Sequence, residues 1–393
     1  MARLGDFFAL IRNGANIKQG LDDSGYPITR IETISNRTVD RNKMGYAGIN
    51  DLSKYRDYIL QDGDILMSHI NSEKHLAKTA LYQKNNGEEV IHGMNLLLLR
   101  PNTDCVISKY AFYYFSSQSF LRQIPNITKK SVNQASFTVS ALKELSFPSV
   151  PLNEQLKIVG VLEKIDTLIE MRKQQLAKLD ELVKARFVEM FGSLNDNKKG
   201  LDIVSIKDLC TLIKDGTHQT PIYTEDTQNG FKFLSSKDVM TQKICWDNIK
   251  YISSELHEKL YVVIQPQRND ILMSKNGVNY GVAAINDTDE VFDIYVSLAL
   301  LRPITDKVNP VYLRCAINNP DTKRQFDSSI KGIGVPNLHL GEIKNTKVLL
   351  PSMEKQTEFV SFVEQVDKSK VAVQKALDEA QTLFYSLMQQ YFG

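Results

Sequence analysis

PLNEQLKIVGVLEKIDTLIEMRKQQLAKLDELVKARFVEMFG, residues 151–192, contains no glycine or proline between Val161 and Phe191. PSMEKQTEFVSFVEQVDKSKVAVQKALDEAQTLFYSLMQQYFG, residues 351–393, repeats this pattern further along the chain and ends in the same Phe-Gly pair. Acidic residues near the start of such a run and a glycine at its end are typical of a capped α-helix. The sequence therefore predicts two long helices of the same design.

Apolar residues recur in both stretches at alternating steps of four and three, which is the spacing of a coiled-coil seam. The second seam repeats the first after a shift of 201 residues, with Arg172, Arg186 and Lys370 as polar positions that can fix the register. We expect the helices, each about 60 Å long, to pair antiparallel; the alternative is that each packs only on its own domain. The expected pairing residues are Ile158, Leu162, Ile165, Ile169, Leu176, Leu179 and Val183 in the first helix and Val363, Val366, Val373, Leu377, Phe384 and Leu387 in the second.

The segments that precede the two helices also match each other. Asp64-Ile-Leu-Met-Ser68 recurs as Asp270-Ile-Leu-Met-Ser274, and Leu98-Leu-Arg100-Pro101 recurs as Leu300-Leu-Arg302-Pro303. Runs such as Ile271–Ser274 and Tyr261–Ile264 read as strands among shorter helical segments. The predicted fold class is α+β. We expect two mixed α/β domains in tandem, separated by two long antiparallel coiled-coil helices and related by a pseudo-twofold axis that reflects an internal duplication.

Loops rich in long polar side chains follow the Ile-Leu-Met-Ser strand and precede the long helix in each repeat. A third polar group runs from Asn36-Arg37 to Arg41-Asn-Lys43, with Lys237 roughly opposite it in the second repeat. Lysine, asparagine and histidine can donate to or accept from base edges in the major groove of DNA. The loops occupy equivalent places in the two repeats but differ in sequence, as expected of two domains that recognise different DNA sequences. For each residue the alternative is an ordinary solvated side chain. The residues expected to contact DNA are Arg37, Arg41, Lys43, His69, Asn71, Lys74, His75, Lys129, Lys130, Asn133 and Gln134 in the first repeat and Lys237, Lys275, Asn276, Asn279, Tyr280, Lys331 and Asn337 in the second.

Bulk composition restricts the class of protein. The 393 residues carry a net charge of only +2, too little for a chain that grips nucleic acid tightly by itself. Either the chain does not bind DNA, or partner subunits supply most of the phosphate neutralisation. Four cysteines without metal-ligand spacing fit a reducing compartment, and no apolar run is long enough to cross a membrane. We expect a soluble, unprocessed protein of a reducing cytoplasm.

A search for catalytic signatures finds one weak match. Asp321, Glu342 and Lys344 fit the loose Pro-Asp…Glu-x-Lys spacing of metal-dependent nucleases. This spacing is short and prone to coincidence, and the first repeat has no counterpart. No phosphate-binding glycine loop and no His-Glu-x-x-His motif occurs. We therefore predict neither catalytic nor metal-binding residues in this chain.

The ordered set of motifs resembles the specificity subunit of Type I restriction–modification systems. It comprises Pro-x-x-Glu-Gln at Pro151–Gln155, a longer version at Pro351–Gln356, the two Asp-Ile-Leu-Met-Ser strands and the two terminal Phe-Gly pairs. The additional Lys355 is a departure that puts the start of the second helix in question. The resemblance implies a target-recognition domain at 1–150, a central conserved helix at 151–192, a second target-recognition domain at 193–350 and a C-terminal conserved helix at 351–393.

The resemblance also implies a bacterial or archaeal cytoplasm, and it implies partners and cofactors. A specificity subunit reads a bipartite site on double-stranded DNA, binds two methyltransferase subunits and joins two restriction/translocase subunits. S-adenosylmethionine, ATP and Mg²⁺ would then belong to those partners, with no cofactor bound by this chain. The competing hypotheses are a stand-alone Mg²⁺-dependent nuclease that uses Asp321, Glu342 and Lys344, and a protein-binding scaffold without a nucleic-acid role.

Overall fold

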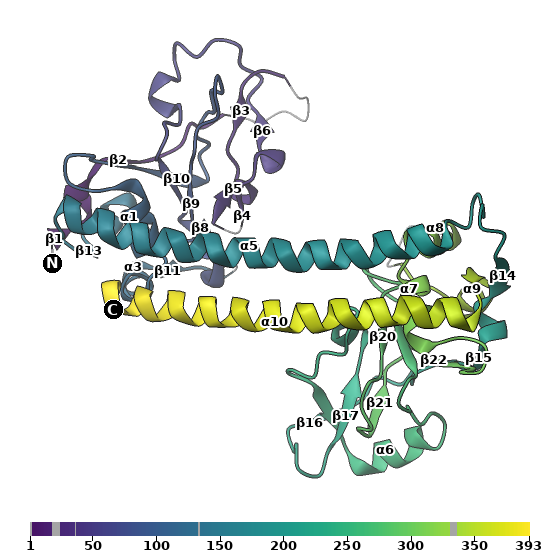
Figure 1. Ribbon diagram of the computed structural model, residues 1–393. Coiled ribbons are helices and arrows are strands. Elements are labelled where there is room, and N and C mark those ends of the chain that lie inside the picture. Colours follow the sequence, from purple (N-terminus) through teal and green to yellow (C-terminus); the bar gives the residue numbers. More distant parts are fainter. Residues whose placement is uncertain (1, 18–23, 36, 133, 331–335) are drawn as a thin grey trace. The chain divides into compact units, whose positions relative to one another are not determined.

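The computed structural model describes residues 2–17, 24–35, 37–132, 134–330 and 336–393. The chain forms two compact units. Unit 1 comprises Met1–Lys173 together with Lys375–Gly393, and unit 2 comprises Gln174–Gln374. Each unit therefore contains one globular repeat and segments of both long helices, α5 (Leu152–Phe191) and α10 (Met353–Phe392), which appear in Figure 1 as two uninterrupted helices.

The globular part of unit 1 is built on a six-stranded sheet in the order β2-β10-β7-β9-β5-β4, antiparallel except where β5 meets β9. Its strands are β2 (Phe8–Asn13), β10 (Leu96–Pro101), β7 (Ile65–Ser68), β9 (Thr79–Leu81), β5 (Thr38–Val39) and β4 (Ile34–Ser35). Smaller sheets join β1 (Ala2–Arg3) to β13 (Ser146–Phe147), β3 (Pro27–Ile28) to β6 (Gly45–Tyr46), and β11 (Lys129–Lys130) to β12 (Ala135–Ser136) and β8 (Ile70–Asn71). The helices are α1 (Ser108–Tyr114), α2 (Gln118–Leu121), α3 (Ile124–Ile127) and α4 (Val139–Lys143), with 3-10 turns at Leu4–Phe7, Ile31–Thr33, Arg41–Lys43, Arg56–Tyr58 and Glu73–His75.

Unit 2 repeats the central ladder as an antiparallel sheet in the order β15-β22-β19-β20. These strands are β15 (Cys210–Asp215), β22 (Leu298–Pro303), β19 (Ile271–Ser274) and β20 (Ala283–Ile285). A second sheet contains β16 (Tyr223–Thr224), β18 (Lys250–Ile252), β17 (Phe231–Leu234) and β21 (Phe292–Ile294), and β14 (Asp202–Ser205) pairs with β23 (Lys347–Leu350). The helices are α6 (Ser254–Tyr261), α7 (Pro310–Ile317), α8 (Pro320–Ser329) and α9 (Leu340–Asn345), with 3-10 turns at Ile206–Leu209 and Ser236–Val239.

The repeated sequence motifs pair with each other in the same register in both units. Leu98 of β10 lies opposite Leu66 of β7, and Leu300 of β22 lies opposite Leu272 of β19. All four side chains are fully buried, because the central strands are covered on both faces and therefore carry continuous apolar runs. The predicted tandem of two mixed α/β domains is confirmed. The prediction of a strand at Tyr261–Ile264 is wrong, since Tyr261 ends α6.

A partly buried ion pair accounts for the aspartate and the arginine of the repeated motifs. The Arg100 guanidinium donates to both carboxylate oxygens of Asp64, at 2.8 and 2.7 Å, across the paired strands β10 and β7. Arg302 donates to both oxygens of Asp270 at 2.8 and 2.8 Å in unit 2. This bidentate geometry is strong and directional. The pair therefore fixes the same strand register in both repeats.

Within unit 2 the two long helices run antiparallel and contact each other through aromatic and charged side chains. Phe187 of α5 lies 5.5 Å from Phe359 of α10 between ring centroids, and Arg186 pairs with Glu358 at 3.4 Å. Further along, Asp180 of α5 accepts from Lys370 of α10 at 2.5 Å. Along the pair of helices the residue numbers decrease on α5 while they increase on α10, as in an antiparallel pair. The polar seam residues Arg186 and Lys370 form cross-helix ion pairs at half-buried positions.

Each globular repeat packs on segments of both helices. In unit 1, Tyr113 of α1 donates to Asp166 of α5 at 3.3 Å and packs on Phe384 of α10, with 6.1 Å between ring centroids. In unit 2, Tyr312 of α7 packs on Phe187 and Phe359. The alternative in which each helix packs only on its own domain is therefore wrong. All thirteen predicted pairing residues are buried or half-buried.

A fully buried glutamine fastens the start of each long helix to its own domain. In unit 1 the Gln155 side chain accepts from the Ile107 N–H at 2.9 Å and donates to the carbonyl oxygens of Cys105, at 2.9 Å, and Val150, at 2.7 Å. These groups belong to the loop before α1 and to the residue two before α5. Every polar atom of the buried carboxamide has a partner, which satisfies backbone groups that would otherwise be orphaned.

Gln356 makes the same set of bonds in unit 2. It accepts from the Asn309 N–H at 2.8 Å and donates to the carbonyl oxygens of Lys307, at 3.3 Å, and Pro351, at 2.9 Å. Because α5 and α10 begin 201 residues apart and the two glutamines are also 201 residues apart, Lys355 does not displace the start of the second helix. The departure lies instead in the proline, which stands one position earlier in the second motif.

We predict that Gln155→Ala and Gln356→Ala each lower the free energy of unfolding by about 2–4 kcal/mol, because each leaves buried backbone donors and acceptors unpaired. Urea unfolding of the full chain measures the effect. Asn153→Ala, an exposed change on the first turn of α5, is the matched control and should stay within about 0.5 kcal/mol of the parent. Equal behaviour of Gln155→Ala and Asn153→Ala would contradict the anchoring role.

Candidate nucleic-acid interface

Two of the predicted DNA-contacting segments of unit 1 meet in one small sheet. Strand β8 continues the chain just after β7, and it pairs antiparallel with β12, which in turn pairs with β11. Asn71 lies opposite Ala135, and Lys130 forms an ion pair at 2.8 Å with Glu73, which follows β8. Segments about sixty residues apart in the sequence thus form one surface at the end of β7. Lys74, Lys129, Lys130 and Gln134 are exposed on it, and Asn71 and His75 are half-buried.

The equivalent two segments of unit 2 meet in the same way. Asn276, two residues after β19, forms an isolated antiparallel bridge with Asn337. The Leu338 N–H donates to the Lys275 carbonyl at 2.9 Å, and the Gly277 N–H donates to the Pro336 carbonyl at 3.1 Å. The structure therefore joins the strand-end segment to the pre-helix segment in both repeats. Of the residues predicted to contact DNA, Asn133 and Lys331 lie outside the described residues.

We call the two surfaces the reading surfaces. Reading surface 1 consists of residues 69–75 and the described residues of 129–136, and reading surface 2 consists of residues 275–281 and 336–337. On reading surface 2, Asn279 and Asn337 are exposed. Tyr280 is half-buried, because its hydroxyl donates to Asp327 at 2.6 Å and the Lys323 ammonium lies 3.4 Å from its ring centroid. The Asn276 side-chain oxygen is buried and has no hydrogen-bond partner among the described residues.

Lys275, at the base of reading surface 2, is buried rather than solvated. Its side chain is 6% exposed, and its ammonium donates to Asp215 at 2.7 Å. Burial acts to raise the pKa of Asp215, but the hydrogen bond and the positive charge of Lys275 outweigh it, so the net shift is downward. Contact between Lys275 and DNA would require this ion pair to open. The Lys275 side chain therefore stabilises the loop of residues 275–281 through its ion pair with Asp215.

His69, at the start of reading surface 1, is buried as well. Burial lowers the pKa of His69, and it lowers the pKa of the neighbouring, fully buried His92 to about 3. Both imidazoles are therefore neutral at pH 7. The His69 ring packs against Phe137, with 6.4 Å between ring centroids. In the free protein His69 contributes packing and carries no positive charge.

The third group of residues predicted to contact DNA lies outside both reading surfaces. It comprises Arg37, Arg41, Lys43 and Lys237. Arg41 makes a bidentate ion pair with Glu88, at 2.9 and 2.5 Å, and donates to the Gln83 carbonyl at 2.7 Å. Lys43 is exposed and lies 3.4 Å from Asp40. Lys237 is exposed on the turn Ser236–Val239 of unit 2.

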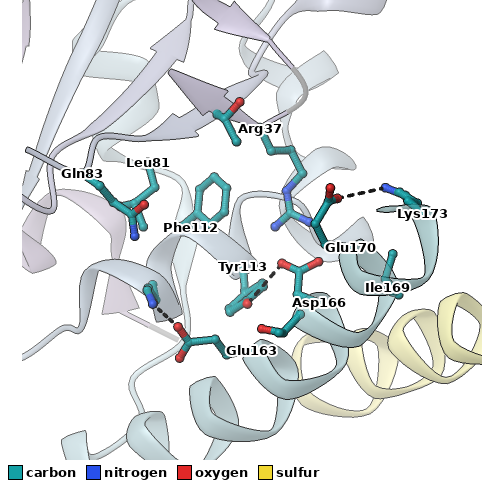
Figure 2. A pocket seen from close by; sticks show the side chains of 13 residues that line it. Arg37, Leu81, Gln83, Phe112, Tyr113, Glu163, Asp166, Ile169, Glu170 and Lys173 are labelled. Atoms are coloured by element: carbon teal, nitrogen blue, oxygen red, sulfur yellow. Dashed lines mark hydrogen bonds and ion pairs between the residues drawn. The ribbon is translucent and has the colours of Figure 1, made fainter. Parts of the chain in front are cut away.

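Arg37 is directed toward the helices of unit 1. Figure 2 shows its side chain pointing into a pocket of about 460 Å³ toward acidic residues of α5. The guanidinium carbon lies 4.7 Å from the ring centroid of Phe112, and two guanidinium nitrogens are buried without a hydrogen-bond partner among the described residues. Asp166 and Glu170 line the same pocket. The sequence analysis predicted Arg37 to be a loop residue that contacts DNA. It did not predict this packing, because Phe112 lies 75 positions further along the chain.

The residues of the nuclease hypothesis are not arranged as a metal site. Glu342 and Lys344 lie on α9, and Asp321 lies on the first turn of α8, where its carboxylate accepts from the Leu194 N–H at 2.7 Å and pairs with Arg324. Across the described ranges, no group of three or more histidine, cysteine, aspartate or glutamate side chains could hold a metal ion. Nor does any helix there combine the length and apolarity needed to cross a membrane.

Comparison with known proteins gives consistent results. A family model described as the Type I restriction modification DNA specificity domain matches residues 1–181 and 198–380. Over 194 residues the chain is 42% identical to a putative specificity subunit of the type I restriction enzyme MjaX from Methanocaldococcus jannaschii, a match that covers 48% of this chain and 44% of that protein. The specificity subunit of MjaVIII from the same organism is 21% identical over 82% of this chain and 78% of its own length.

The fold has counterparts among solved structures. The S subunit of a type I restriction–modification system from M. genitalium superimposes with a TM-score of 0.55 at 15% identity, over 100% of this chain and 95% of that one. A structure described by complex assembly and conformational transition of the type I R-M system gives a TM-score of 0.54 at 16% identity, over 100% and 96% of the two chains. At these identities the likeness concerns the fold alone.

The buried histidines predict acid sensitivity of unit 1. Above pH 6.5 His92 is neutral in both the folded and the unfolded chain, so its contribution does not vary with pH. Below that pH the unfolded chain takes up a proton that the folded chain refuses until about pH 3, so folding stability falls as the pH falls. We expect a loss of about 2 kcal/mol between pH 6.5 and 5.0 from this residue alone.

Urea unfolding at pH 6.5 and pH 5.0 measures this loss. His92→Leu should remove most of it, whereas His339→Leu, at an exposed position, should leave it unchanged. The same pH dependence in the parent and in His92→Leu would show that the buried imidazole is not its source.

Proposed function

This chain belongs to the Type I restriction–modification DNA specificity family, and from that premise we propose that it is the DNA-reading subunit of such a system. It recognises a target made of two half-sites, one for each unit, and directs partner subunits to that target. The chain spans 44% of the length of the first relative described above and 78% of the second. The activity of the whole protein is accordingly part of the proposal.

The pair of reading surfaces is the observation that carries this function. In both units the same two segments meet at the end of the Ile-Leu-Met-Ser strand, on a scaffold of matching register. The scaffold residues are shared between the repeats, whereas the reading-surface residues differ. Two domains that recognise different half-sites need a shared scaffold and different surface residues, because the DNA backbone is the same at both half-sites and only the base edges differ.

The helices suggest an upper bound for the distance between the half-sites. Each helix has 40 residues, which corresponds to about 60 Å and so to at most about 18 base pairs at about 3.4 Å each. Half-site centres about one helical turn apart would place both readers on one face of the duplex. We therefore propose a bipartite target with a short nonspecific spacer.

We further propose that chemistry is delegated to partner subunits. Two methyltransferase subunits and two restriction/translocase subunits would complete the enzyme in the cytoplasm, and S-adenosylmethionine, ATP and Mg²⁺ would bind to them. The methyltransferase would flip the chosen adenine out of the stack. Exposed apolar residues on the long helices, including Leu156, Leu168, Leu182, Leu383 and Tyr385, provide surface for such partners.

Comparison of adenine methylation in host cells with and without this gene tests the function most directly. We expect one bipartite sequence to lose methylation when the gene is deleted. The purified chain mixed with its neighbouring methyltransferase should restore methylation at that sequence in vitro. Failure to form a complex, or methylation without sequence preference, would contradict the proposal. Mg²⁺-dependent cleavage by the lone chain that is abolished by Glu342→Ala would instead favour the nuclease hypothesis.

We predict that Lys74→Ala and Lys129→Ala on reading surface 1 weaken DNA binding through lost phosphate contacts. Each change should reduce the slope of log affinity against log salt by about one, and by the same amount for target and non-target duplexes. Equilibrium binding of the reconstituted complex at several salt concentrations measures the slope. Arg122→Ala, an exposed change at the end of α2, should leave it unaltered. An unaltered slope in both lysine variants would show that neither lysine contacts a DNA phosphate.

A further inference from the structure

The two most exposed large hydrophobic side chains of the described residues lie on the two reading surfaces. Val132 on reading surface 1 is 99% exposed, and Val278 on reading surface 2 is 90% exposed. One belongs to each unit, and each stands in a segment singled out by its polar side chains. In the free protein neither valine contributes to the hydrophobic core.

Local structure gives no reason for Val132. It lies in the connection between β11 and β12, where the Ser131 N–H and hydroxyl both donate to the Gln134 carbonyl, at 2.7 and 2.9 Å. Connections of this kind favour glycine, asparagine, aspartate or serine, and β-branched residues have no advantage there. The ion pair between Lys130 and Glu73 already holds the hairpin at its base. The valine is therefore not explained by folding of the hairpin.

Val278 has a comparable setting built from different parts. It lies in a loop whose glycines Gly277 and Gly281 adopt φ values of 87° and 86°, which glycine adopts at little cost. The Ser274 hydroxyl donates to the Asn279 carbonyl at 2.8 Å and closes the loop. Backbone bonds to the pre-helix segment hold its other side. The loop thus presents Val278 to solvent from a supported base.

We propose that Val132 and Val278 each contact the 5-methyl group of a thymine in the major groove, one in each half-site. This inference rests on the proposed function. The thymine methyl is the apolar group that a base edge offers in that groove, and the minor groove offers none. The sequence neighbours of each valine are polar residues or glycine, and reading surface 1 exposes one further large apolar side chain, Ile70, at 37%. This limited apolar area suits one small apolar group and not the extended apolar face of another protein. Each half-site must therefore contain a thymine on one of its strands.

Replacement of thymine by deoxyuridine tests this contact, since it removes the methyl group and leaves the pairing edge intact. The complex of the full chain with its methyltransferase is titrated with target duplexes that carry single thymine-to-deoxyuridine changes. For the parent we expect about a fourfold loss of affinity at one thymine in each half-site, the value of one buried methyl group. Val132→Ala should bind the thymine and deoxyuridine forms of one half-site equally, and Val278→Ala those of the other.

Each variant serves as the control for the other, because its effect must be confined to one half-site. Ile203→Ala, an exposed position on β14 that belongs to neither reading surface, should keep the parental preference at both half-sites. The inference is overturned if a half-site lacks thymine, if no single change matters, or if the valine variants retain the parental preference. Loss of affinity in Val132→Ala that is equal for all duplexes would indicate a wedge between base pairs and would also overturn it. A parent complex without preference for the bipartite target would instead defeat the proposed function itself.

Discussion

The buried carboxamides of Gln155 and Gln356 are the constraint on which each unit depends. Each is fully buried and has every polar atom paired with backbone of its own domain. Burying a carboxamide without hydrogen-bond partners is unfavourable in free energy. The position of the helix start relative to the domain is therefore restricted to one that keeps all these hydrogen bonds. The glutamine therefore fixes where the long helix leaves the domain. The loop before α1 or α7, which it clamps, leads directly into the helix that packs on α5 and α10.

Shared and divergent residues divide the work within each repeat. The shared Asp64–Arg100 and Asp270–Arg302 pairs hold the same strands in the same register. Beyond those strands the repeats use different side-chain contacts. In unit 1 the Arg37 guanidinium lies over the Phe112 ring of α1, whereas in unit 2 Arg314 of α7 donates to the Gln242 carbonyl at 3.3 Å.

The charges of the candidate interface explain how a nearly neutral chain can serve DNA recognition. Several cations near the reading surfaces are engaged within the protein, among them Lys275 with Asp215 and Lys130 with Glu73. Such pairs orient loops and contribute little net field. Under the proposed function, such a chain would select among sequences through shape and base-edge contacts, and its partner subunits would supply most of the phosphate neutralisation. Specificity and affinity would then come from different subunits.

Sequence patterns alone predict the two long helices, their apolar seam and the duplication, because helix periodicity and strand motifs are local features of a single chain. They also pick out the segments of the reading surfaces. Only the fold brings β8 alongside β12, since that pairing joins positions far apart in the sequence and depends on strand register. It likewise decided that Lys275 and His69 are buried and that Arg37 faces the helices. A residue type states which bonds a side chain can make, and only the folded surroundings determine which of them it does make.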